Sequence, residues 1–321
     1  DPADSSMIRF SKSTDGGQSW SDAISINKVS GNCVDSDDTT EGAVPAVGPN
    51  GEIFVAWAGP DGLVFYRSYD QGLTWLEDDI WISDIPGGWD YDIPGINRSN
   101  GLPITVCDTT GGAYDGAIYV NWTDQRNGDD DTDVWIAKSS DNGNTWSSPI
   151  RVNDDNSGRH QFFTWMALDQ TNGNLWFVFY DRRETENEWT DLYGAVSYDG
   201  GDSFVNFKIS ESSFMPQQGV FFGDYTNITV YDNVVRPIWT RLDNTDLSLW
   251  TAIIDVQSIG IDQPEVNDIS LLQNYPNPFD GNTYIKFKLY RGSKVSLKVT
   301  DICGKEVAVL LNEEYYDLGK H

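Results

Sequence analysis

The chain has 321 residues, with 50 acidic against 21 basic side chains and a formal net charge of −29. This charge excludes nucleic acid as an expected partner, because binding to phosphates needs a basic surface. No apolar run reaches the length of about 18 residues that predicts a membrane span. The chain begins at Asp1 in polar sequence and shows no signal peptide, which is typical of a processed or partial chain.

Short strands dominate the predicted secondary structure, because brief apolar or alternating runs are separated by turn-forming residues. Between residues 43 and 210 the strands come in three sets of four, and the sets before and after them are incomplete. In chain order the predicted strands are 7–11 and 24–27; 43–47, 53–57, 63–67 and 80–83; 102–107, 118–122, 134–138 and 150–153; 164–168, 175–180, 192–196 and 207–210; and 225–231, 234–240 and 247–254.

A turn motif, S-x-D-x-G-x-[ST]-[WF], precedes the last strand of every set except the final one. Its Asp can accept backbone N–H groups across a tight turn, and its Gly allows a positive φ. Its aromatic residue is expected to return to the core as the next strand begins. The motif positions are Ser13, Asp15, Gly17 and Trp20; Ser68, Asp70, Gly72 and Trp75; Ser139, Asp141, Gly143 and Trp146; and Ser197, Asp199, Gly201 and Phe204.

Four-stranded units that repeat at this period predict an all-β fold, a β-propeller over residues 1–256 with an incomplete N-terminal blade. Six blades are favoured and five are the alternative; either the two ends complete each other or N-terminal sequence is missing. The repeated turn resembles the Asp-box, or bacterial neuraminidase repeat, which sialidases and sortilin-like receptors share. This resemblance implies a sialidase-like propeller, and it bears on the fold more than on the chemistry.

Residues 257–267 are predicted to be a linker, and residues 268–321 a small second domain. Its runs YPNPF, from Tyr275 to Phe279, and VTDICGKEVA, from Val299 to Ala308, resemble the C-terminal sorting domain of type IX secretion substrates, known from the Bacteroidetes. The resemblance implies a truncated Ig-like β-sandwich, the type IX secretion machinery as partner, and an extracellular or outer-surface location. An ordinary β-sandwich spacer is the alternative.

Successive turns of a propeller alternate between two faces. In the sialidases that the repeat resembles, the active site lies on the face opposite the motif turns, so the resemblance implies that chemistry is to be sought there. Three of the turns that join second to third strands place an Arg near an Asp, just after an aromatic residue. They predict either a mouth that grips carboxylate or sulfate groups of a glycan, or salt bridges that recur because the blades recur. The groups are Asp124 with Arg126, Asp181 with Arg182 and Arg183, and Asp243 with Arg241.

The turns between blades supply further candidates. Trp89 and Tyr91 could stack on sugar rings, or they could cap the edge of the core. The residues that we expect to bind ligand are Trp89, Tyr91, Arg126, Arg159, His160 and Arg183.

A sialidase-like enzyme needs three arginines around a carboxylate, a Tyr nucleophile activated by a Glu, and an Asp acid/base. By this resemblance Arg98, Arg182 and Arg241 are candidates for the clamp. Tyr225 is a candidate nucleophile, and Asp224 beside it is a further catalytic candidate. The Arg-Ile-Pro motif that opens sialidase domains is absent, which weighs against this activity.

Metal and disulfide chemistry are weakly indicated. Asp129, Asp131 and Asp133 offer oxygen ligands suited to Ca²⁺, and solvated loop charge is the alternative. No cofactor is required, and with two His and three Cys a zinc site is not predicted. The odd Cys count does not form a framework, although a single bridge between Cys33 and Cys107 is one alternative.

Three functions follow from these observations. The first is a secreted, non-catalytic propeller that binds a glycan or another extracellular partner such as a surface protein. The second is an exo-acting, sialidase-like glycoside hydrolase. The third is a structural or adhesive surface component, which exposed apolar patches on the propeller rim would favour.

Overall fold

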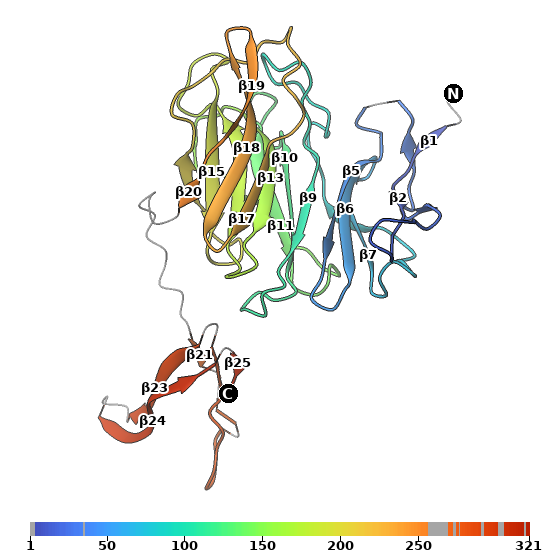
Figure 1. The fold of residues 1–321 in the computed structure, drawn as a ribbon. Coiled ribbons are helices and arrows are strands. Elements are labelled where there is room, and N and C mark those ends of the chain that lie inside the picture. The colour runs from blue at the N-terminus through green and yellow to red at the C-terminus, as the bar shows by residue number, and fades with distance from the viewer. Residues whose placement is uncertain are drawn as a thin grey trace. The chain divides into compact units, whose positions relative to one another are not determined.

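The computed structural model describes residues 4–34, 36–255, 269–271, 274–275, 277–289, 292–300, 305–317 and 319–321. The chain divides into a larger unit of residues 1–110 and 114–262 and a smaller unit of residues 111–113 and 263–321. Within the described residues every regular element is a β-strand (Figure 1), so the all-β prediction is confirmed. None of these residues forms a helix long and apolar enough to cross a membrane.

The larger unit is a β-propeller built from antiparallel sheets of consecutive strands. Three of its blades are complete, four-stranded meanders, as the repeat predicts. They are formed by β5 (Glu41–Val47), β6 (Ile53–Gly59), β7 (Gly62–Ser68) and β8 (Ile80–Ser83); by β9 (Ile104–Cys107), β10 (Ile118–Asp124), β11 (Asp133–Ser139) and β12 (Ile150–Arg151); and by β13 (Gln161–Leu168), β14 (Leu175–Asp181), β15 (Asp191–Ser197) and β16 (Val205–Lys208).

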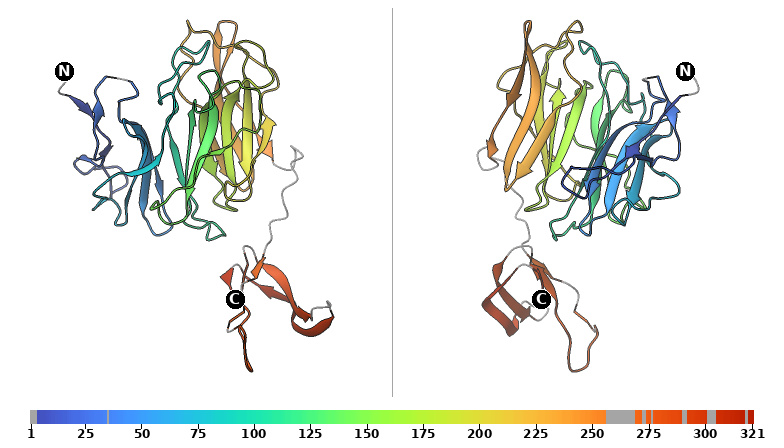
Figure 2. Two further views of the ribbon diagram at one scale, coloured as in Figure 1. Left: turned by 180° about the vertical axis from the view of Figure 1, so that it is seen from behind. Right: turned by 45° about the vertical axis from the view of Figure 1, so that its right-hand side comes forward.

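The two ends of this unit are partial blades. At the N-terminus β2 (Arg9–Phe10) pairs with β3 (Ile24–Ser25), and β1 (Ser5–Ser6) pairs with β4 (Gly31–Asn32). At the other end β18 (Val234–Asp243) pairs with β17 (Asn227–Tyr231), β19 (Asp246–Thr251) and β20 (Ile254–Asp255). Among the described strands these end sheets do not pair with each other, and Figure 2 shows them at opposite ends of the row of blades.

Blade stacking explains why the central strands are buried on both faces. In β10, Ile118, Val120 and Trp122 pack toward the preceding blade. The alternate residue Tyr119 packs toward the following blade. The first strands β5, β9, β13 and β17 lie side by side in chain order, as expected for strands around a common axis.

The four motif turns share one hydrogen-bond pattern. In the third, the Ser139 hydroxyl donates to Asp141 Oδ1 at 2.8 Å and accepts from the Gly143 N–H at 2.8 Å. Asp141 also accepts from the backbone N–H and the hydroxyl of Thr145, at 2.9 and 2.7 Å. The motif Gly residues have φ between +79° and +86°, the left-handed region that Gly adopts without strain. The expected role of each polar position is therefore realised.

The motif aromatic packs against the blade before its own. Trp75 lies edge to face on Phe10, with ring centroids 4.9 Å apart. Trp20 departs from the expectation, since it is 67% exposed. Its sheet is the first of the described sheets, and the ring packs against none of the others.

The last blade is buried on one face only. Val235 and Trp239 pack against the β13–β16 blade. On the opposite face of the same sheet Ile238 is exposed, and Leu249 is 74% exposed. In each complete blade, the following blade covers the equivalent face.

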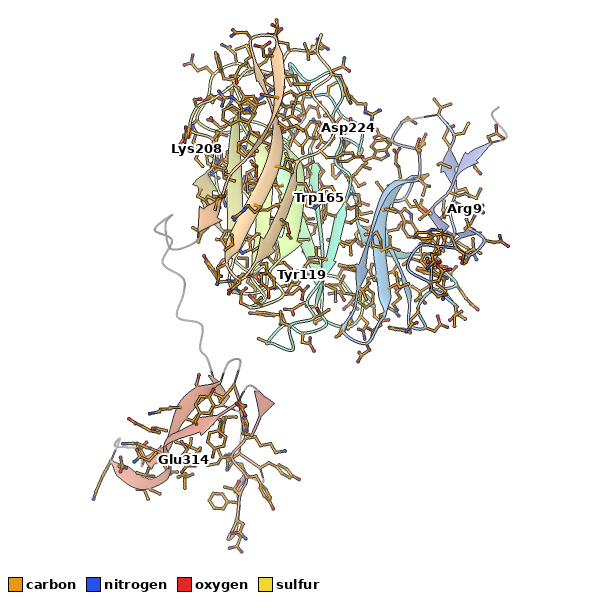
Figure 3. All side chains as sticks on the ribbon, viewed as in Figure 1. Arg9, Tyr119, Trp165, Lys208, Asp224 and Glu314 are labelled. Carbon is orange, nitrogen blue, oxygen red and sulfur yellow. The ribbon has the colours of Figure 1, made fainter. Side chains whose placement is uncertain are left out.

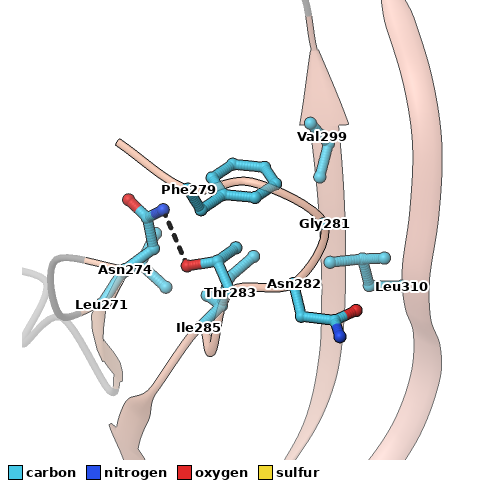
Figure 4. A pocket seen from close by; sticks show the side chains of 9 residues that line it. All are labelled: Leu271, Asn274, Phe279, Gly281, Asn282, Thr283, Ile285, Val299 and Leu310. Carbon is cyan, nitrogen blue, oxygen red and sulfur yellow. Dashed lines mark hydrogen bonds between the residues drawn. The ribbon is translucent and has the colours of Figure 1, made fainter. Parts of the chain in front are cut away.

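The smaller unit contains two sheets. β21 (Ile269–Leu271), β22 (Phe287–Leu289) and β25 (Gly319–Lys320) form one, and β23 (Ser293–Thr300) and β24 (Glu306–Tyr316) form the other. This unit has an apolar cavity of about 710 Å³, lined by residues that include Phe279, Val299 and Leu310. Figure 4 shows the side chains that line it.

The predicted linker at 257–267 lies outside the described residues. In the larger unit Cys107 is a buried free thiol, so the alternative of a bridge to Cys33 is wrong. Burial, with the nearby carboxylate of Asp108, raises the pKa of this thiol to about 12, so it is unreactive.

Candidate functional site

Two long loops meet on the face opposite the motif turns, which we call the upper face. The loop between β8 and β9 supplies Asn97, whose side-chain amide donates to the carbonyl of Gln218, in the loop between β16 and β17, at 3.0 Å. Arg98 from the first loop forms an ion pair with Asp224 from the second at 2.9 Å. Figure 3 shows Asp224 at this edge, away from Tyr119, which lines a cavity beside the third motif turn.

Three arginines at equivalent turns are fixed by carboxylates two positions away. Arg126 Nε donates to Asp124 Oδ1 at 2.9 Å, and Arg183 Nε donates to Asp181 Oδ2 at 2.8 Å. Arg241 Nε donates to Asp243 Oδ2 at 2.6 Å. These contacts favour the interpretation that the arginines form salt bridges that recur because the blades recur.

Each of these guanidinium groups also stacks on an aromatic ring of its own blade and reaches a neighbouring segment. Arg126 lies 4.5 Å from the ring centroid of Trp135, and Arg183 lies 4.5 Å from that of Tyr193. Arg241 donates to the backbone carbonyl of Ser212, which follows the preceding blade. Cation–π contacts and shared hydrogen bonds of this kind connect the blades.

Among the carboxyl groups of these turns, Asp181 has the pKa that departs most from its ordinary value. Its side chain is buried, and burial raises its pKa to about 6 despite the opposing effect of Arg183. Asp243 is more exposed, and its hydrogen bonds from Arg241 lower its pKa.

Arg182, next to Arg183 in the chain, has a different environment. Its side chain is 1% exposed, and its guanidinium lies 5.2 Å from the ring centroid of Phe162. Its Nε donates to the hydroxyl of Thr190 at 3.1 Å, while its Nη2 is buried without a hydrogen-bond partner. Among the described residues no carboxylate lies within ion-pair distance of Arg182.

Arg159 and His160 flank this buried guanidinium from the loop before β13. Arg159 Nη2 donates to the carbonyl of Asn187 at 2.6 Å, and its Nε is buried without a partner. His160 is buried, with Nδ1 3.1 Å from the hydroxyl of Thr132. Burial, with the charges of Arg182 and Arg159, lowers the pKa of His160 to about 4, so it is neutral at pH 7.

A small groove opens beside Tyr225. Its volume is about 250 Å³, and Trp165, Tyr225, Asn227 and Thr240 contribute to its lining. The rings of Trp165 and Tyr225 meet edge to face, with centroids 6.2 Å apart and planes at 87°. Tyr225 is 53% exposed.

A β-bulge lies next to Trp165 in the strand. The register of β13 against β14 shifts between Phe162 and Trp165, and Phe163 within the bulge has φ +50°. A bulge changes the direction in which a strand's side chains point, and a positive φ for an aromatic residue is strained. The hydroxyl of Thr226 donates to the Phe163 carbonyl at 2.6 Å.

The structure corrects two sugar-stacking expectations. Trp89 and Tyr91 are both buried in hydrophobic clusters, Trp89 with the first two complete blades and Tyr91 with the third complete blade and the partial last blade. Both rings therefore belong to the core-edge alternative. The sequence indicates the exposed Tyr225 only as a candidate nucleophile, and it predicts a strand position without a functional role for its partner Trp165.

Each arginine predicted for a sialidase-like clamp is held by contacts of its own within the protein. Arg98 pairs with Asp224, Arg241 pairs with Asp243, and Arg182 is buried over Phe162. Burial, together with the charges of Asp224 and Glu41, raises the pKa of Tyr225, which is the opposite of activation for a nucleophile.

The acidic loop does not form a metal centre. Among the described residues no group of three or more His, Cys, Asp and Glu side chains could hold a metal ion. Asp133 instead accepts hydrogen bonds from Asn127 and Asn153, each at 2.6 Å. Asp129 is exposed, and Asp131 is half-buried. This arrangement does not support the Ca²⁺ assignment to the loop, which stays a prediction.

These observations define a β-propeller followed by a small β-domain. Residues 273–317 match the family of secretion system C-terminal sorting domains. The protein is therefore secreted or carried on the outer cell surface, and the type IX secretion machinery is a partner, as the sequence resemblance implied. A search of curated proteins finds no match to the chain.

Several solved structures resemble this chain in fold. A protein of unknown function from Dyadobacter fermentans is 19% identical, with 80% of this chain and 70% of that chain covered and a TM-score of 0.48. The NanB sialidase from Streptococcus pneumoniae is 15% identical, with 78% and 36% covered and a TM-score of 0.44, so the chain matches about a third of that protein. The α-L-arabinofuranosidase Arb93A from Fusarium graminearum is 14% identical, with 81% and 77% covered and a TM-score of 0.43.

Proposed function

We propose that the protein is a secreted or surface-carried, sialidase-like propeller that binds an extracellular glycan in the groove beside the last blade without cleaving it. The groove of Trp165 and Tyr225 carries this proposal. Sugar rings bind to exposed aromatic faces through their C–H groups, and nearby polar groups orient them. Asn227 and Thr240 supply such groups at the same groove.

Binding is preferred to hydrolysis because the arginines and carboxylates of the upper face neutralise one another. Arg98 with Asp224 and Arg241 with Asp243 are ion pairs at 2.9 and 2.6 Å. Groups held in such pairs are scaffold, and a hydrolase would need some of them directed at the substrate.

A glycan array screened with the labelled protein, followed by titration of the best ligand, tests the proposal. Tyr225→Ala should weaken binding about tenfold or more, since a lost ring contact removes about 1–2 kcal/mol. Tyr231→Ala is the matched control, because Tyr231 is 73% exposed and lies outside the groove. Equal effects of both variants would count against the groove, and release of free sugar at an enzymic rate would establish the hydrolase instead.

The adhesive function is the second candidate, and the exposed face of the last blade favours it. Ile238, Leu249 and Tyr231 lie exposed on that sheet, and the first two also line the groove. An apolar patch of this kind is typical of interaction surfaces. Concentration-dependent self-association of the protein in sedimentation experiments, without detectable glycan binding, would favour this function over the first.

A further inference from the structure

The cavity beside the third motif turn shares no lining residue with the groove of Trp165 and Tyr225. Its volume is about 460 Å³, within the range of about 300–1,000 Å³ that is typical of small-molecule sites. The rings of Tyr114 and Trp146 contribute to its lining. We call this cavity the turn-side pocket.

Two polar groups of the lining have no hydrogen-bond partner among the described residues. Tyr119 is fully buried, and its hydroxyl makes no hydrogen bond. The indole N–H of Trp146 is buried in the same way. An unsatisfied buried donor is costly, so such groups normally meet a protein atom, an ordered water or a ligand. Both donors belong to one pocket, so a single ligand with two acceptor atoms would satisfy them.

The pocket opens at a motif turn that carries a small residue at its second position. Ser140 takes this position and lines the pocket, and it is exposed. Tyr69 and Tyr198 stand at the equivalent positions of the second and fourth motif turns. A Tyr is therefore accommodated in this kind of turn, and the third turn has room for a ligand in its place.

The buried hydroxyl is also particular to this blade. The strand position of Tyr119 is taken by Phe54 and Trp176 in the other two complete blades, and neither side chain has a hydroxyl. The loop before this strand, residues 108–117, is longer than its equivalents in those blades, and it supplies Tyr114 to the lining. The repeat alone does not explain this combination.

The charges around the pocket favour an uncharged ligand. Lys138 in the lining is already paired with Asp202 at 2.5 Å, and its ammonium also donates to the Gly200 carbonyl at 2.9 Å. Burial, with the carboxylate of Asp108, raises the pKa of Tyr119, so its hydroxyl keeps its proton and can donate. Carboxylates this close disfavour an anion.

We infer that the turn-side pocket is a second binding site, which takes one uncharged sugar unit. A sugar has several oxygen acceptors around a compact ring and apolar C–H groups on its faces. These features match two buried donors, from Tyr119 and Trp146, beside the aromatic ring of Tyr114. The inference goes beyond the proposed function, because it does not require the groove.

Ligand-detected nuclear magnetic resonance with the full protein tests this inference. The probes are the methyl glycosides of glucose, galactose and mannose, and methyl glucuronide is the charged comparison. At least one neutral probe should bind, and it should bind more tightly than methyl glucuronide. Absence of binding by all three neutral probes, or equal or tighter binding of the glucuronide, would overturn the inference.

Ser140→Tyr fills the mouth of the pocket with the side chain that two other motif turns carry. It should weaken binding of the neutral probe about tenfold or more and leave the unfolding temperature unchanged, because the core is not altered. Thr14→Tyr, at the same position of the first motif turn, is the matched control and should bind normally. Equal binding by the two variants would refute the site.

Tyr119→Phe separates a ligand-binding hydroxyl from a structural one. It should weaken binding about three- to tenfold without lowering the unfolding temperature, since the hydroxyl has no partner to lose. In the control Tyr91→Phe the lost hydroxyl is one that donates to the Asn100 carbonyl at 3.2 Å. The control should therefore unfold at a lower temperature and bind normally. A lower unfolding temperature for Tyr119→Phe with unchanged binding would refute the inference.

Tyr225→Ala distinguishes the pocket from the groove. Binding of the neutral probe that persists in Tyr225→Ala and is lost in Ser140→Tyr belongs to the pocket. The reverse pattern would overturn the inference and leave the groove standing. Binding that depends on Ser140 alone, without any effect of Tyr225→Ala on larger glycans, would refute only the proposed function.

Discussion

Phe65 in one blade and Trp146 in the next meet edge to face, with ring centroids 5.1 Å apart and planes at 66°. Phe65 comes from the third strand of its blade, and Trp146 is the aromatic position of the following blade's motif turn. The motif therefore does more than close a turn, since its aromatic residue connects its blade to the one before.

Trp146→Ala should lower the free energy of unfolding by about 2–4 kcal/mol, because it removes a large ring from a packed contact between blades. The matched control is Trp20→Ala, at the same motif position of the first turn. Trp20 is 67% exposed, so the control should change stability little. Urea unfolding of both variants measures this, and similar losses would contradict the role in blade packing.

The strand pattern could be predicted because each blade repeats the same local signals. Alternation located the strands, and the motif Gly and Asp residues located the turns. The fate of single loop side chains could not be predicted, and Arg182 and Arg183 show why. They are adjacent, yet one is buried over Phe162 and the other pairs with Asp181. Which of them points inward depends on the tertiary packing, and no periodicity governs a turn.

The groove also depends on tertiary structure. Trp165 lies in a strand whose sequence predicts simple alternation. The bulge that precedes it contains no Gly that would have indicated a bulge from the sequence. Trp89 and Tyr91 lie in a loop, where aromatic residues can be either exposed or buried. Long-range packing decided between those two alternatives.

The motif carboxylates should make the protein sensitive to acid. Hydrogen bonds from the motif hydroxyls and N–H groups lower the pKa values of Asp15, Asp70 and Asp141 from 3.8 to about 2. A lowered folded-state pKa gives stability that is present above about pH 4 and is lost as the pH falls toward 2. Thermal unfolding between pH 5 and pH 2 should follow this fall, and Asp141→Asn should have a shallower slope. An unchanged slope in the variant would contradict the assignment.

Asp181 should change stability with pH in the direction opposite to that of the motif carboxylates. Burial raises its folded-state pKa from 3.8 to about 6, so the folded protein holds this proton more tightly than the unfolded chain. Stability from this group therefore increases as the pH falls from about 6 to about 4. Asp181→Asn should remove this increase from the unfolding temperature. Asp243→Asn is the matched control from an equivalent turn and should leave that pH range unchanged, because hydrogen bonds lower the pKa of Asp243.

Substitutions on the two faces of the last blade should change the free energy of unfolding by different amounts. Val235→Ala should lower the free energy of unfolding by about 1–3 kcal/mol, because Val235 is fully buried against the preceding blade. Leu249→Ser should change it by less than about 0.5 kcal/mol, because Leu249 is 74% exposed. Urea unfolding at several protein concentrations measures both. If another surface covers this face in solution, Leu249→Ser would instead be strongly destabilising, and a loss that grows with protein concentration would identify that surface as a second copy of the chain.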